Sequence, residues 1–276
     1  MERSIARVEA AQPPARSAPT HANRMVMAPD RFAEHSPFLM LAEDWFAPPA
    51  GFPTHPHRGM ETVTLVLEGQ MLHRDHTGGQ GALEPGDVQW MTAGKGVMHS
   101  EMPGPKGVHS LQLWLNLPGA QRLSKARYQD QPASQAQVLT GEGWEMRLYA
   151  GRQGEAERPH GSSYPMGLVT LRAEPGSRLE LQIPADERAF LYVISGSATA
   201  GADRTPVSAG QVAWVDPSGA AGAADTLTLE AREPLQAVLY SGRPIDEPVV
   251  AYGPFVMNTM DEIKQAFDDY RSGAFL

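Results

Sequence analysis

Short apolar segments bounded by turn residues run through most of the chain. In the first half they span residues 38–41, 61–67, 88–91 and 111–117, and they are rich in β-branched and aliphatic side chains. Runs of this length with Gly, Pro and Asp between them are typical of β-strands. The second half repeats the pattern in residues 166–172, 177–183, 189–194, 211–215, 226–230 and 235–240. Short strands at this spacing predict a β-barrel in each half.

Two turns are expected in the first half. Glu68-Gly69-Gln70-Met71 is interpreted as a turn between strands, and the segment HRDHTGGQG that follows predicts a hairpin with Thr77-Gly78-Gly79 at its tip.

The C-terminus has a different period. Thr259-Met-Asp-Glu262 matches a capping box, and Ile263, Ala266, Phe267 and Tyr270 follow it at helical spacing. We predict that this short helix packs its apolar face on a barrel. The fold class predicted from the two patterns is all-β, with two β-barrel domains and a short C-terminal helix.

Composition places the domain boundaries. Residues 1–24 are rich in Ala, Pro and Arg, and we expect a flexible N-terminal arm or an edge strand there. Residues 119–137 are polar and poor in apolar side chains, which is typical of a linker. We therefore place the N-terminal domain at residues 25–125 and the C-terminal domain, which includes the helix, at residues 126–276.

Charge and cysteine content exclude several classes of protein. The 23 Lys and Arg residues against 32 Asp and Glu give a formal charge of −9, which disfavours direct binding of nucleic-acid phosphates. No apolar run approaches the roughly 20 residues that span a bilayer. The absence of cysteine excludes disulfides, thiolate nucleophiles and cysteine-bound zinc. Because the first 24 residues lack the apolar core of a signal peptide, we expect a cytoplasmic protein.

The candidate chemistry lies between residues 51 and 103. His55-Pro-His57 precedes one predicted strand, and His99-Ser-Glu101 follows another. Side chains two residues apart in a strand share a face, so two neighbouring strands can direct three imidazoles and a carboxylate at one point inside a barrel. These groups suit Fe(II), Mn(II), Co(II), Ni(II), Cu(II) or Zn(II), and an octahedral ion would keep two positions for substrate and O2.

Other interpretations of these residues remain open. The histidines could be hydrogen-bonded residues of a polar barrel core, although burying them without partners would be unfavourable. The concentration of six of the nine histidines between residues 55 and 109 favours a metal site. Strand parity also turns Glu61 to the same side as His55 and His57, which makes Glu61 a rival for the fourth ligand position. His73 and Asp75 share a face and are candidates for orienting a metal-bound imidazole.

The second half carries a reduced copy of the same stretch. PADERAFLYVISGSA parallels HPHRGMETVTLVLEGQM, and VSAGQVAWVDP parallels LEPGDVQWMTA. The copy keeps the glycines and the apolar pattern but has no His-x-His, and the histidine of this half, His160, falls in a predicted loop. We expect the second barrel to be metal-free.

Four segments, in order, resemble the pirin family of bicupins: PTHPHRGMETVTLVLEG, PGDVQWMTAGKGVMHSEMP, LQLWLNLP and EPVVAYGPFVMNT. The resemblance runs from about Pro37 to the C-terminus. It implies a metal, usually iron, held by His55, His57, His99 and Glu101, and it therefore favours Glu101 over its rival. It also implies two kinds of activity, since some pirins have quercetin 2,3-dioxygenase activity and others are metal- or redox-dependent regulators that bind protein partners.

Our first hypothesis is an Fe(II)-dependent dioxygenase that cleaves a flavonol such as quercetin with O2 and releases carbon monoxide. Glu101 would be both a ligand and the catalytic base that takes the proton of the 3-hydroxyl group, with Phe52, Trp45 and Met60 as wall residues. The alternative is a regulatory protein whose metal sets the conformation for a protein partner, without turnover. A purely structural metal is disfavoured, because a four-ligand site leaves two positions open.

Overall fold

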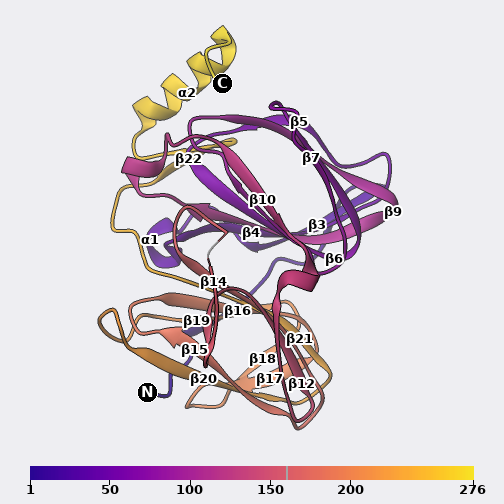
Figure 1. The fold of residues 1–276 in the computed structure, drawn as a ribbon, viewed down its shortest axis with the longest axis vertical. Coiled ribbons are helices and arrows are strands. Elements are labelled where there is room, and N and C mark those ends of the chain that lie inside the picture. Colours follow the sequence, from indigo (N-terminus) through magenta and orange to yellow (C-terminus); the bar gives the residue numbers. More distant parts are fainter. Residues whose placement is uncertain (160) are drawn as a thin grey trace. The chain divides into compact units, whose positions relative to one another are not determined.

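The computed structural model describes residues 1–159 and 161–276, and it is built mostly of β-strands (Figure 1). Contacts divide the chain into two compact units. The first comprises Met1–Gln12, Gln135–His160 and Pro165–Pro244, and the second comprises Pro13–Ser134, Gly161–Tyr164 and Ile245–Leu276. The prediction of an all-β fold with a sheet-built unit in each half and a short C-terminal helix is confirmed. The position expected for His160 lies outside the described residues.

The first unit consists of two antiparallel sheets around one apolar core. One sheet has the strand order β1-β19-β16-β21-β14-β12-β11, with β13 added to β12, and the other has the order β15-β20-β17-β18. Their bounds are β1 Arg7–Ala10, β11 Gln137–Gly141, β12 Trp144–Gln153, β13 Ala156–Arg158, β14 Met166–Ala173, β15 Arg178–Pro184, β16 Arg188–Ser195, β17 Ser197–Ala200, β18 Thr205–Ser208, β19 Gln211–Val215, β20 Ala224–Ala231 and β21 Leu235–Gly242. Leu171, Leu181 and Leu229 belong to one buried cluster, so inward side chains of both sheets form this core.

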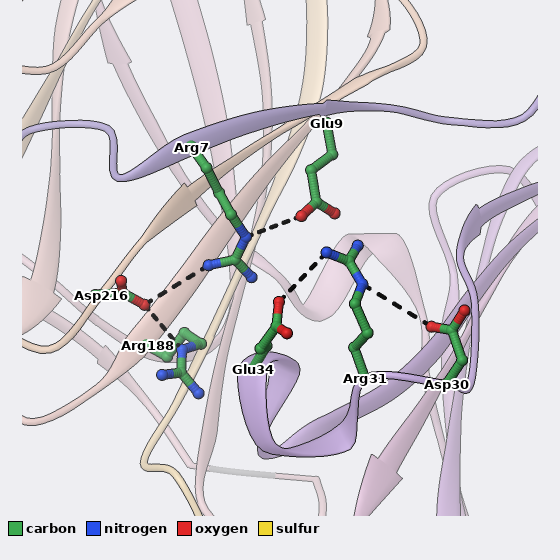
Figure 2. Close-up of polar contacts among 7 residues, drawn as sticks. All are labelled: Arg7, Glu9, Asp30, Arg31, Glu34, Arg188 and Asp216. Carbon is green, nitrogen blue, oxygen red and sulfur yellow. Dashed lines mark hydrogen bonds and ion pairs between the residues drawn. The ribbon is translucent and has the colours of Figure 1, made fainter.

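The N-terminal strand β1 is an edge strand of the first unit, within the segment expected as a flexible arm or an edge strand. Its residues pair antiparallel with β19. Figure 2 shows Arg7 hydrogen-bonded to Glu9 and facing Asp216, which also contacts Arg188. Ion pairs near the surface contribute only about 0–1 kcal/mol each. Backbone pairing is therefore the main reason that β1 stays on the sheet.

The second unit is organised around the long strand β9, Val97–Asn116. Its sheet has the order β10-β8-β6-β9-β4-β3-β2, with β5 added to β9 and β7 added to β6, and β22 and β23 form a separate hairpin. The remaining bounds are β2 Ala15–Ala18, β3 His21–Met27, α1 Phe32–His35, β4 Phe38–Phe46, β5 Phe52–His57, β6 Met60–Asp75, β7 Gln80–Leu83, β8 Val88–Thr92, β10 Arg127–Gln131, β22 Val250–Tyr252, β23 Phe255–Met257 and α2 Met260–Ser272. Because β9 pairs with β4, β5 and β6, it brings three distant segments of the sequence together.

The short helix α1 leads from β3 to β4 in the second unit. Arg31 forms ion pairs with Glu34 and Asp30 (Figure 2), and the N···O distances are 3.3 and 4.0 Å, respectively. The hydroxyl of Ser36, just after α1, donates to the carbonyl of Ile245 and accepts from its backbone N–H. These buried hydrogen bonds hold the start of the C-terminal segment in the same unit as α1.

The turn expected at residues 68–71 is wrong, because β6 continues through it. The pairing of β6 with β9 shifts register between Val66 and Glu68 and again between Gly69 and Met71. Gly69 has φ 74°, and a Cβ atom there would overlap the carbonyl of Gly107. The two register shifts are therefore β-bulges, which bend a strand without reversing it, and Gly69 lies at the second of them. The hairpin expected with its tip at Thr77-Gly78-Gly79 is confirmed, since it joins β6 to β7.

The segment expected as a linker contributes a strand to the second unit. β10 pairs antiparallel with β8, and Tyr128 lies opposite Met91. The units therefore differ from the contiguous domains placed at residues 25–125 and 126–276. An open sheet edge accepts any strand with free backbone groups, whatever its distance in sequence. Since β10 is rich in polar residues, its composition resembles that of a linker.

The C-terminal helix α2 begins where the sequence predicts. The hydroxyl of Thr259 accepts from the backbone N–H of Glu262, and the Glu262 carboxylate accepts from the backbone N–H of Thr259, so the capping box is confirmed. Ile263 packs with Phe255 and Phe275 in a buried cluster of the second unit. Within the described residues, no helix is long and apolar enough to cross a membrane.

Candidate metal centre

Strand β5 brings both residues of the His-x-His pair beside β9. The two strands are antiparallel, and His55 lies directly opposite His99 while Phe52 lies opposite Glu101. The candidate ligand atoms of His55, His57 and His99 all lie within 4.8 Å of one another. The structure thus gathers the three histidines that the sequence singles out, from two strands that are about 40 residues apart in the chain.

The spacing of these imidazoles fits a first-row transition-metal ion. The Nε2 atoms of His55 and His57 lie 3.0 Å apart. Two nitrogens that bind one metal at about 2.1 Å and at right angles are separated by about 3.0 Å. Both ring nitrogens of His99 are buried and have no hydrogen-bond partner among residues 1–159 and 161–276. Because such a group costs about 1–3 kcal/mol, a bound cation would relieve an unfavourable burial.

Burial keeps two of the imidazoles in the form that binds metals. Desolvation, with a smaller effect of His55, lowers the pKa of His57 to about 3, although the carbonyl of Pro254 acts in the opposite direction. Desolvation and the neighbouring imidazoles also lower the pKa of His99. Nδ1 of His55 lies 2.9 Å from the carbonyl oxygen of Pro53, which makes Nδ1 the protonated nitrogen and leaves the lone pair on Nε2. At neutral pH, His57 and His99 are therefore uncharged and able to act as ligands.

Glu101 is buried on the same strand, two residues after His99, and protein groups hold its carboxylate. Oε2 accepts a hydrogen bond of 2.7 Å from Nε2 of Gln112, and Oε1 accepts one of 3.3 Å from the hydroxyl of Thr64. The group of histidines that could hold a metal, as found among the described residues, does not include Glu101. Its roles as fourth ligand and as base therefore stay predictions.

Glu61 faces away from this site, so the parity prediction for it is wrong. Its carboxylate accepts a hydrogen bond from the hydroxyl of Thr92 on β8. The hydroxyl of Thr64 donates a hydrogen bond to the carboxylate of Glu101 on β9. Because Thr64 lies three residues after Glu61 on β6, the side chains of Thr64 and Glu61 point to opposite faces of the sheet. Parity does not carry over from His57, because a turn with Gly59 at φ 81° separates β5 from β6. Burial raises the pKa of Glu61, in agreement with its enclosed position.

His73 lies beside the three histidines. Its ring centroid is 5.3 Å from that of His99 and 5.2 Å from that of Tyr128, and β6 pairs it directly with Glu101. Burial lowers its pKa. Asp75, expected to act with His73, instead accepts hydrogen bonds from the hairpin tip at Oδ1. The carboxylate of Asp75, which was expected to orient a metal-bound imidazole, therefore stabilises the hairpin turn instead.

Aromatic rings lie beside two of the three histidines. Phe52 and Trp114 lie with ring centroids 5.9 Å from His55 and 5.3 Å from His57, respectively. Trp45, expected at the wall, instead stacks on His109. It lies next to Phe46, whose ring packs against that of Phe52, and adjacent residues of a strand point to opposite faces.

Sequence reasoning missed the polar residues that hold Glu101. Gln112 alternates with buried leucines along β9, and this polar position in an apolar strand was the available signal. Thr64 gave none, because threonine is common in strands. Tyr128 falls within the segment expected as a linker, and only the pairing of β10 with β8 places it near His73.

Known proteins resemble this chain over most of its length. Residues 15–115 match the family model described as Pirin, and residues 168–276 match that of the Pirin C-terminal cupin domain. A pirin-like protein of Solanum lycopersicum is 41% identical over 239 residues, which cover 86% of this chain and 81% of that protein. A Vibrio cholerae protein provisionally named quercetin 2,3-dioxygenase is 42% identical over 255 residues, or 87% and 86% of the two chains. A quercetin 2,3-dioxygenase structure from Acinetobacter baumannii has a TM-score of 0.90 at 29% identity, with 100% of this chain and 98% of that chain covered.

Proposed function

Because this chain belongs to the pirin family, we propose that it is a metal-dependent dioxygenase that cleaves flavonols such as quercetin. The observation that carries the proposal is the group of three close imidazoles, among which His99 has two buried nitrogens without a partner in the described chain. Similarity to proteins named for quercetin 2,3-dioxygenase supports the type of reaction.

Four side chains would hold the ion: His55, His57, His99 and Glu101. We propose Fe(II), although the same donors suit Mn(II), Co(II), Ni(II), Cu(II) and Zn(II). The ion would supply a Lewis acid for the substrate oxygen and a binding position for O2. To join the ion, the carboxylate of Glu101 has to use an oxygen lone pair that is free of its hydrogen bonds to Gln112 and Thr64.

Glu101 is also the proposed base. Its carboxylate is buried, and two neutral side chains, those of Gln112 and Thr64, donate hydrogen bonds to it. It takes the proton of the flavonol 3-hydroxyl, which leaves an anionic oxygen on the substrate. Phe52 and Trp114 offer apolar ring surfaces for a planar aromatic substrate.

The overall reaction needs no external reductant. One O2 molecule reacts with one flavonol, two carbon–carbon bonds of the heterocycle break, and one carbon leaves as carbon monoxide. Both oxygen atoms of O2 end in the products. The residues of the chain bind and orient the substrate, take one proton and exclude water from the apolar side of the site.

The test is O2 consumption by metal-free protein that has been reconstituted anaerobically with Fe(II) and then mixed with quercetin and O2. We expect about one O2 per quercetin consumed, and a loss of at least about 100-fold in His57→Ala. His76→Ala is the matched control, since His76 is exposed at the hairpin tip, and it should retain the activity.

Two results would contradict the proposal. Full turnover by His57→Ala would show that the reaction does not use this centre. Tight Fe(II) binding without O2 consumption would favour the alternative, a metal-dependent regulator that binds a protein partner.

A further inference from the structure

His73 is a buried histidine that has no role in the proposed reaction as described above. It lies on β6 with 1% of its surface exposed, and neither ring nitrogen has a hydrogen-bond partner within the part of the chain that the structure describes. Buried polar side chains normally have a partner, because desolvation without one is unfavourable. An imidazole of this kind indicates a position where a polar group from outside the chain binds.

The position of His73 is next to the metal ligands and on their side of the sheet. β6 and β9 pair His73 with Glu101, and this places its side chain on the face that also carries His99, two residues away. The ring centroids of His73 and His99 are 5.3 Å apart. The group of described residues whose ligand atoms lie within 4.8 Å of one another does not include His73. His73 is thus a neighbour of the candidate ligands rather than one of them.

The residues around His73 hold its ring by packing and are hydrogen-bonded elsewhere. Tyr128 packs against the imidazole with centroids 5.2 Å apart. Oδ1 of Asp75 accepts hydrogen bonds from the hairpin tip, and both oxygens of Glu101 accept from side chains of the barrel. Within the described residues, these contacts orient the ring and leave its nitrogens available.

We propose that His73 donates a hydrogen bond to the anionic ligand that enters the metal centre from outside, and that in turnover this ligand is the ionised hydroxyl oxygen of the substrate. The inference rests on the proposed function for the presence of the metal at the three histidines. A neutral imidazole carries one N–H group, and this group can donate to an anionic oxygen beside the metal. In a site from which water is excluded, such a donor favours the ionised form of the hydroxyl over the neutral one. The ligand class is therefore a small anion or a planar molecule with an ionised enol or phenol oxygen.

The experiment uses the full-length protein loaded with Co(II), whose visible absorption reports its ligands, and titrates it with azide as the anionic probe. The variants are His73→Phe, which keeps a ring but removes the N–H, and His73→Gln, which keeps an N–H donor. We expect the Co(II) affinity of both to stay within about threefold of the wild type. The azide affinity should fall by at least about tenfold in His73→Phe and by no more than about threefold in His73→Gln. If His73→Phe does not fold, its place is taken by His73→Leu.

Two outcomes would overturn the inference. Equal azide affinities in the wild type and in the variant without an N–H would show that His73 does not contact the ligand. A Co(II) affinity reduced by more than about tenfold in both variants would make His73 a metal ligand instead. Because the readout does not involve quercetin, a protein that shows the azide effect but no O2 consumption would refute the proposed function and support the role of His73.

Discussion

Acid should destabilise the metal-free protein through His57. Burial lowers the pKa of this imidazole in the folded chain to about 3, from an ordinary value of 6.5. Below pH 6.5 the unfolded chain therefore binds a proton that the folded chain does not bind until the pH approaches 3. The stability that His57 contributes is fully present above pH 6.5 and is lost progressively as the pH falls from 6.5 towards 3.

The size of the effect follows from this interval. Each pH unit between the two pKa values costs about 1.4 kcal/mol of unfolding free energy. At about pH 5, which is about 1.5 units below the ordinary pKa, His57 alone accounts for a loss of about 2 kcal/mol. The lowered pKa values of His99 and His73 have the same sign and add to the loss.

The assay is urea unfolding of the metal-free protein at about pH 7.5 and about pH 5. The wild type should lose at least about 2 kcal/mol between the two pH values, and His57→Gln should lose about 2 kcal/mol less than the wild type does. The exposed His76→Gln should lose as much as the wild type. An equal loss in the wild type and in His57→Gln would refute the reasoning, since it would mean that His57 titrates alike in both states.

Three further predictions concern hydrogen bonding and packing in the second unit, and each is tested through the free energy of unfolding in urea. Gln112→Leu removes the donor from Oε2 of Glu101 and should cost about 1–3 kcal/mol; no loss would mean that the carboxylate finds another donor. Phe275→Ala removes a buried ring and should cost about 3–5 kcal/mol, whereas Leu276→Ala, at an exposed position, should cost less than about 0.5 kcal/mol. Equal losses in the two would contradict the docking of the C-terminus. Thr259→Ala should cost about 1 kcal/mol and Thr259→Ser much less, because serine keeps the cap; equal costs would argue against the cap.

The hydrophobic period and the turn residues of the sequence were sufficient to predict several of the strands. Residues 61–67 lie within β6, residues 111–116 of the segment 111–117 lie within β9, and residues 166–172 and 235–240 lie within β14 and β21. The start of α2 at Thr259 was equally local, since a capping box involves only four consecutive residues. The convergence of His55, His57 and His99 also followed from spacing, once two strands were assumed to be neighbours.

The mistaken expectations have a common cause. The alternation of side chains along a strand predicted that Glu61 points to the same face as His55 and His57, but the turn at Gly59 interrupts this alternation between β5 and β6. The segment from Glu68 to Met71 looked like a turn, and it is a pair of bulges in a strand that continues to Asp75. In each case a glycine could mark a reversal, a bulge or a change of face, and the sequence near it does not distinguish these three outcomes.

The all-β class, the position of the C-terminal helix and the stretch that carries the candidate ligands could be predicted from the amino-acid sequence alone, because each depends on periodicity or spacing within a few residues. The pairing of strand edges, which assigns β10 and α2 to the unit with the three histidines, is known only from the folded chain. The hydrogen bonds from Gln112 and Thr64 to Glu101 and the position of His73 beside His99 are likewise known only from the folded chain. Strand pairing is a contact between backbones that are distant in sequence, and a local pattern carries little information about which partner a strand meets.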